Sequence, residues 1–244
     1  MISKLSIQES NKILREMAKE HGFHTRGKAH FRVIGDGVLQ VIKFEYENRA
    51  IIDHILYVGL FSMYSKLLPR WFTSGGCIPQ YGVYRFIGKN DIGCNPDGSE
   101  QLFVNKALTR EDQLQVLSEY VFDILDEITT QKVLVKSMCQ LDCVTHGISW
   151  NDYLKFSPFL HCGELHNAEK VMTAIIKQHK LADEANRNHH IQFSEEYYER
   201  SKREDIELER ELDLAQSRDM NRIKEYLQSH YDANMLNTKF CRHP

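Results

Sequence analysis

Basic side chains at alternate positions form the clearest chemical pattern in the sequence. They are Arg26, Lys28, His30 and Arg32, with Lys43 in the following segment. Because alternate residues of a β-strand project to the same face, these donors would line up within about 15 Å, at ~3.3 Å per residue. Such a stripe could contact phosphates or an acidic partner surface. The interpretation that we favour is a solvated outer face, with Glu45 as the partner of Lys28.

An apolar segment within residues 63–80 is a second candidate for binding. Its large apolar side chains are Leu67, Leu68, Trp71 and Phe72. Tryptophan and arginine often anchor protein interfaces, and Arg70 precedes Trp71. The same side chains could instead fold down over the sheet or over its junction with the helices, because satellite packing under a long loop is common. Packing is the favoured interpretation, and recognition stays open.

Catalysis finds less support in the sequence. There is no Gly-x-Ser-x-Gly elbow, no phosphate-binding loop and no Gly-x-Gly-x-x-Gly that opens a helix. Cys77 follows two glycines, which permit close approach of a ligand. Asp53 and His54 lie in an otherwise apolar segment, and a buried acid needs a partner, for which Arg85 is the nearest candidate by type. A polar cleft that uses these residues and His30 would make the protein an enzyme, but structural pairing explains them as well.

Cysteine and histidine at helical spacing raise the question of a metal site. The residues are Cys139, Cys143, His146, His161, Cys162 and His166. Side chains four residues apart share a helix face, as paired ligands require. The spacings nevertheless lack the short, paired loops of structural zinc sites. We therefore predict buried helical cysteines, no bound metal and no cofactor.

A helix and a β-hairpin are expected at the start of the chain, and the hairpin would position the basic residues. The spacing of apolar residues predicts a helix over 7–21, capped by Ser6 or Ser10 and ended by Gly22. Strands are expected over 25–34 and 38–47. A two-residue type I′ turn at Asp36-Gly37 would join them.

This turn would fix the register of the hairpin. It would place Val33 opposite Gln40 and Phe31 opposite Ile42. One face would then carry the apolar residues and the other the basic residues, and a shift by one residue would mix the two sets.

The remaining elements follow from apolar spacing. Further strands are expected over 51–61, 81–87 and 102–104, the first of them apolar on both faces. Thr109 and Asp112 form an acidic variant of the capping box ahead of a helix that reaches Ile128. The expected later helices cover 131–141, 150–156, 165–180, 195–215 and 220–231. Residues 182–192 have almost no apolar content and are expected to form an exposed connection.

The pattern as a whole predicts an α+β protein. An N-terminal helix would precede an antiparallel sheet of about four or five strands with a covering helix, and a mainly helical half would follow. We expect a sheet domain over residues 1–130 and a helical region over 131–244, which packs on it or forms a small second domain. The charged helix near 195–211 has a thin apolar stripe, so its contact with a second copy of the chain is an alternative to packing by one edge.

Composition narrows the class of protein. With 42% hydrophobic and 27% charged residues, the 244-residue chain is expected to be globular. A formal charge of −3 and a pI near 6.5 give no overall attraction to nucleic acid or to acidic membranes. No apolar window is long enough to cross a bilayer, and residues 1–11 lack the layout of a signal peptide. Six scattered cysteines are expected to be free thiols in a cytoplasmic protein.

Part of the sequence resembles a known family. The helix that ends in Gly22-Phe23, the strand that ends in Phe31-Arg32, the run 38–44 and the strand 55–60 resemble the domain-of-unknown-function 4304 family. The similarity covers roughly residues 5–130. It implies a fold for that half and no activity, so no catalytic residues carry over.

These observations predict a non-catalytic cytoplasmic binding or protein-interaction protein. It would use the basic hairpin face or the 63–80 loop to bind a protein partner, with the helical half as a scaffold or as a homodimer contact. An enzyme of unrecognised type is the alternative.

Overall fold

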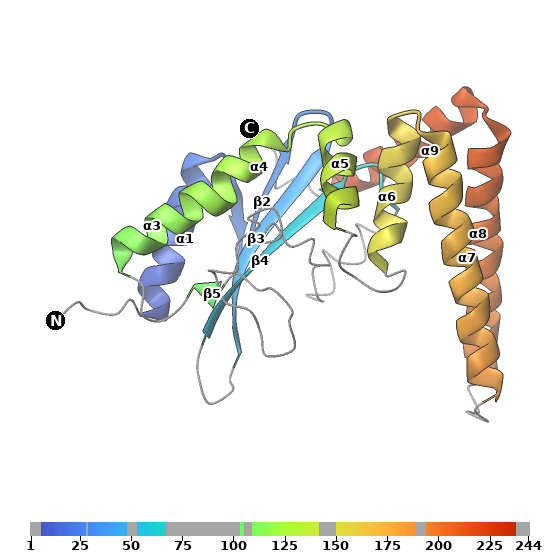
Figure 1. Cartoon of the computed structure of the whole chain (residues 1–244), viewed down its shortest axis with the longest axis horizontal. Coiled ribbons are helices and arrows are strands. Elements are labelled where there is room, and N and C mark those ends of the chain that lie inside the picture. The colour runs from blue at the N-terminus through green and yellow to red at the C-terminus, as the bar shows by residue number, and fades with distance from the viewer. Residues whose placement is uncertain are drawn as a thin grey trace.

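The computed structural model describes residues 6–27, 29–47, 53–66, 103–104, 109–141, 150–188 and 194–237 (Figure 1). An N-terminal helix, an antiparallel sheet and a mainly helical C-terminal half follow one another, so the predicted α+β class is confirmed. The strands are β1 (His24–Arg26), β2 (Ala29–Ile34), β3 (Val38–Glu47), β4 (Asp53–Ser62) and β5 (Phe103–Val104). Neighbours in the chain are neighbours in the sheet, in the order β1-β2-β3-β4-β5. No helix in the described residues is long and apolar enough to cross a membrane.

Helix α1 (Ile7–Glu20) begins and ends as its sequence predicts. Ser6 caps the first turn by accepting a hydrogen bond from the Glu9 N–H, while the Glu9 carboxylate accepts one from the Ser6 N–H. At the other end Gly22 has a φ of 77°, and the N–H of Phe23 donates to the Ala18 carbonyl at 2.8 Å. This left-handed glycine cap turns the chain toward the sheet.

The segment predicted as one strand over 25–34 is two strands. Gly27 has a φ of 61°, and β1 folds back on β2 with His24 opposite Phe31 and Arg26 opposite Ala29. The prediction of a single strand was wrong because the alternation of side chains continues across a tight turn and conceals it.

The register predicted for the next hairpin was also wrong by one residue. Arg32 lies opposite Gln40 and His30 opposite Ile42, so the turn contains Gly35, Asp36 and Gly37. Directly opposed residues point to the same face. The observed register therefore mixes basic and apolar residues on one face, the outcome that the two-residue turn would have avoided.

That mixed face is covered by helices. Helix α3 (Arg110–Leu117), the π-helical segment η3 (Ser118–Phe122) and helix α4 (Asp123–Glu127) run on from one another and lie with α1 on one side of the sheet (Figure 1). Their buried apolar side chains are Leu117, Val121, Phe122 and Leu125. Gln40 is fully buried beneath them and donates to the carbonyls of Leu125 and Ile128 at 2.7 and 3.0 Å.

The turn at 35–37 joins the sheet to the helical half. Its Asp36 carboxylate accepts a hydrogen bond from the N–H of Gln131, the first residue of α5 (Gln131–Leu141), at 2.7 Å. The Gln131 side chain donates to the Gly37 carbonyl at 2.9 Å. A residue distant in sequence thus caps α5, and the turn docks where α4 leads into it.

The later helices are α6 (Trp150–His161), α7 (Leu165–Asn188), α8 (Glu195–Ser217) and α9 (Met220–Asn237). α5 and α6 contact β4 from the side of the sheet away from α1 (Figure 1). Helix α7 continues well past Lys180, so the exposed connection expected over 182–192 was wrong up to residue 188. The extension is helical although it is polar, because it pairs with α8.

Two apolar clusters form the interior. One includes α1, the sheet, α3 and α4 and also takes in Leu134, Met138 and Leu154. The other includes side chains of α6, α7, α8 and α9 together with Val135. Helix α5 contributes to both clusters, so side chains on both sides of residue 130 share one interior.

Candidate functional site

The predicted basic face is not formed by His30 and Arg32. They are 4% and 6% exposed and lie beneath α1 and α4. Arg26 is exposed on β1. Lys28 lies outside the described residues, and at Lys43 the structure describes only the backbone of β3. The prediction failed because the spacing of side chains does not show which face of the sheet α1 and α4 cover.

Arg32 is the centre of a buried polar cluster. Its guanidinium contacts the Asp126 carboxylate at 2.5 Å, donates to the Gln40 side chain at 2.7 Å and donates to the His21 carbonyl at 2.6 Å. It also lies over the Phe23 ring at 4.4 Å. These contacts join α1, β2, β3 and α4, so the role of Arg32 is structural.

His30 should make the fold sensitive to acid. Burial, with a smaller effect of Arg15, lowers the pKa of His30 from 6.5 to about 4. Between these values the unfolded chain binds a proton that the folded protein does not, so stability falls as the pH decreases from about 6.5 to about 4. The loss reaches roughly 2–3 kcal/mol. We expect His30→Gln to remove most of this loss, measured as the urea-unfolding free energy at pH 7 and pH 4.5.

The exposed His166 on α7 provides the matched control for that experiment. His166→Gln should keep the pH dependence of the wild type, because it leaves the burial of His30 unchanged. An unchanged pH dependence in His30→Gln would contradict the assignment.

Several other predicted residues fall outside the described side chains. They are Trp71 and Phe72 of the loop, Arg85, Cys77, Cys143 and His146. Asp53 and His54 lie on β4 opposite Glu47 and Tyr46, and there the structure describes the backbone alone. The cleft that would use Asp53, His54 and Arg85 therefore stays a prediction.

The cysteine and histidine residues that are described do not gather. Cys139 is exposed, contrary to the prediction of buried cysteines, and Cys162 is half-buried. The His161 ring lies 4.4 Å from the Tyr64 ring. Burial raises the pKa of the Cys162 thiol, which disfavours the thiolate that a metal or a substrate would need.

A second buried polar network lies where α6, α8 and α9 meet. The Glu211 carboxylate is 4% exposed and accepts hydrogen bonds from the hydroxyl groups of Tyr153, at 2.6 Å, and Tyr226, at 2.8 Å. The Lys66 ammonium lies 3.3 Å from Glu211 and 2.8 Å from Glu207. Burial raises the pKa of both tyrosines, so they stay protonated as donors. Every group has a partner, which marks the network as structural.

The outer halves of α7 and α8 form what we call the arm, residues 177–188 and 195–210. In Figure 1 the arm extends beyond α6, and its two helices lie side by side. Of the described side chains, none between 177 and 186 is buried, and between 195 and 210 only Ser201 is buried. The arm is therefore a pair of helices with solvent on its outer faces.

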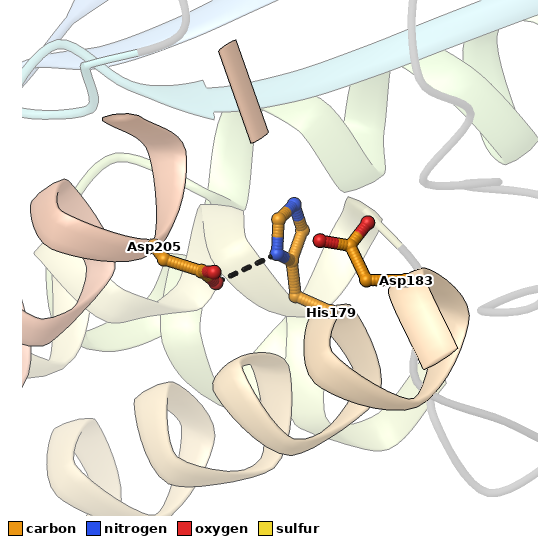
Figure 2. Close-up of side chains that lie close together, drawn as sticks. All are labelled: His179, Asp183 and Asp205. Carbon is orange, nitrogen blue, oxygen red and sulfur yellow. Dashed lines mark hydrogen bonds and ion pairs between the residues drawn. The ribbon is translucent and has the colours of Figure 1, made fainter. Parts of the chain in front are cut away.

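Polar side chains fill the seam of the arm. His179 Nδ1 is 2.9 Å from the Asp205 carboxylate (Figure 2). The other ring nitrogen of His179, Nε2, is 3.5 Å from Glu204. One turn further along, the Ser201 hydroxyl donates to Asp183 at 2.5 Å. Helical spacing of four residues sets both pairs, His179 with Asp183 on α7 and Ser201 with Asp205 on α8.

Sequence analysis did not single out this cluster. The signal available was the spacing of four residues, and it is common in any charged helix. The packing of α8 against α7 brings Asp205 next to His179 and Asp183, and the spacing of residues alone does not predict this packing.

Comparison with protein-family models, with curated proteins and with solved structures yields no match. The resemblance of residues 5–130 to the domain-of-unknown-function 4304 family stays a prediction. The fold defines an α+β protein with a helix-covered antiparallel sheet and a projecting helical arm.

Proposed function

We propose that the protein is a non-catalytic, cytoplasmic protein-interaction protein and that the arm is its main contact surface. The observation that supports this most is that almost all the described side chains of the arm are exposed or only half-buried. Leu181 is 54% exposed and Ile206 is 42% exposed. Large apolar side chains on a projecting helix pair are suited to a protein partner, because burying them on contact is favourable.

The start of the 63–80 loop lies beside this surface. Lys66, the last described residue of this segment, bonds to Glu207 of the arm and to Glu211. Trp71 and Phe72 follow within a few residues. We include them in the proposed contact surface, whereas the buried His30 and Arg32 are no longer part of it.

A crosslinking experiment tests the arm directly. A photoreactive amino acid placed at Leu181 or at Ile206 in the full chain should crosslink to one protein in cells of the host. The control position is Lys12, which is exposed and should not give that product. It belongs to α1, and Figure 1 shows that helix at the opposite side of the molecule from the arm. The same product from Lys12, or none from either arm position, would contradict the proposal.

Variants then measure the contribution of the arm. Leu181→Glu with Ile206→Glu should reduce capture of the crosslinked protein by tenfold or more and leave the thermal unfolding midpoint unchanged, since both side chains are exposed. Trp71→Ala with Phe72→Ala tests the loop separately. A crosslink to a second copy of the chain would instead identify the contact as a homodimer, which light scattering would detect.

A further inference from the structure

The seam of the arm brings together three side chains that are able to hold a metal ion. His179 and Asp183 come from α7 and Asp205 comes from α8. One ligand atom of each lies within 4.8 Å of those of the other two. Among the residues that the structure describes, no other set of three or more histidine, cysteine, aspartate and glutamate side chains converges in this way. Figure 2 shows the imidazole of His179 between the two carboxylates.

The type of donor indicates the type of cation. Calcium and magnesium are bound by oxygen ligands, whereas an imidazole nitrogen favours zinc and the neighbouring transition metals. Zinc accepts histidine nitrogen at about 2.0–2.1 Å and carboxylate oxygen at about 2.0–2.2 Å, and tetrahedral sites place neighbouring donors about 3.4 Å apart. The distance from His179 Nδ1 to Asp205 is 2.9 Å, a hydrogen bond. For a metal ion to take the place of the proton between them, His179 Nδ1 and the Asp205 oxygen would have to move apart by about half an ångström.

Charge in the seam also favours a cation. Glu204, 3.5 Å from the imidazole, adds a third carboxylate to those of Asp183 and Asp205, and one imidazole cannot neutralise three acids. Two basic side chains of the arm are placed by their ion pairs. Lys180 bonds to Glu209 at 3.0 Å, and Arg200, whose guanidinium is 4.0 Å from Glu204, offsets only part of this charge.

We propose that His179, Asp183 and Asp205 bind a divalent transition-metal ion of the zinc type, with water as the fourth ligand. The Ser201 hydroxyl, which donates to Asp183, orients that carboxylate from outside the site. The ion would link α7 to α8 where their contact is polar.

Calorimetric titration of the chelator-treated full chain with zinc chloride provides the test. The wild type should bind one zinc ion per chain in a saturable manner. His179→Gln and Asp205→Asn should each weaken that binding by a hundredfold or more, since even outer-shell changes cost tenfold to a hundredfold. The matched controls are His166→Gln, an exposed histidine on α7, and Asp213→Asn, an exposed aspartate on α8 that pairs with Arg222. Both should bind zinc as the wild type does.

Two further measurements test whether each variant is folded and which ligands bind the ion. Thermal unfolding without metal shows whether each variant is folded, and only folded variants are compared. Cobalt(II) bound at this site should show the absorption of a nitrogen- and oxygen-ligated ion and no thiolate-to-cobalt charge-transfer band, because no cysteine is among the ligands. A thiolate band, binding that persists in both ligand variants, or no one-to-one binding by the wild type would overturn the proposal.

Discussion

Replacing Gly35 with alanine should destabilise the protein by more than about 4 kcal/mol, or prevent it from folding. Two effects add at this position. Gly35 has a φ of 56°, which a side chain disfavours, and a Cβ atom built on it would lie 1.7 Å from the carbonyl oxygen of Thr129. The clash is with backbone, so no rotation of a side chain relieves it. The measurement is the free energy of urea unfolding.

Gly27 provides a control in the same protein. Its φ of 61° is nearly the same, but a Cβ atom there would meet nothing within 4 Å. Gly27→Ala should therefore cost only the backbone term, about 1–2 kcal/mol. The difference between the two variants isolates the docking of the 35–37 turn against Thr129. Equal losses would show that the turn is not docked there.

Replacing Arg32 with leucine should cost about 2–4 kcal/mol, because a buried acceptor left without its donor costs about 1–3 kcal/mol, whereas the Asp126 side chain is 43% exposed and can be hydrated. The change leaves the Gln40 side-chain oxygen and the His21 carbonyl without this donor, while Asp126 keeps its contact with His21 Nδ1 at 2.7 Å. It also tests the corrected position of Arg32, because a residue on a solvated face would tolerate leucine. Urea unfolding at neutral pH measures the loss.

Arg26→Leu is the comparison for this variant, since Arg26 was predicted to share the same face and is exposed. Its cost should stay within about 0.5 kcal/mol. A double-mutant cycle with Asp126→Asn should give a coupling energy of about 1–3 kcal/mol between Arg32 and Asp126. A loss below about 1 kcal/mol for Arg32→Leu would refute the buried cluster.

Local signals in the sequence predict local structure well here. The cap formed by Ser6 and the left-handed Gly22 follow from residue types with one strong conformational preference. The helical segments that begin at 110 and end at 127 follow from apolar spacing, and the helix over 131–141 has the predicted bounds. Each of these depends on neighbours within a few residues.

Contacts between distant segments account for the errors. The Asp36-Gly37 pair suggests a two-residue turn, but Gly35 takes the first left-handed position and shifts the register. Arg32 and His30 belong to a strand whose outer face is covered by α4, about ninety residues later. Basic residues at alternate positions have the same spacing whether the face that they share is solvated or buried. Only the packing of the helices determines whether that face is exposed.

A contact between distant segments also explains why the sequence did not predict the proposed metal site. Sequence analysis considered cysteine pairs, since they are the usual sign of a structural zinc site, and predicted no metal. His179 and Asp183 have the spacing of a ligand pair, but the sequence does not show which residue would be the third ligand. Asp205 reaches them only because α8 runs back along α7.

The amide of Asn234 has a consequence for the order in which the protein folds during synthesis. Asn234 is 1% exposed on α9, and its side-chain N–H groups donate to the carbonyls of Met63 and Ser65, at 2.7 and 2.8 Å, just after β4. During synthesis these carbonyls have no Asn234 donor until about 170 further residues have been made. The segment that follows β4 can thus adopt its final structure only after α9 has left the ribosome. The N-terminal half therefore completes its folding together with the C-terminal half and not before it.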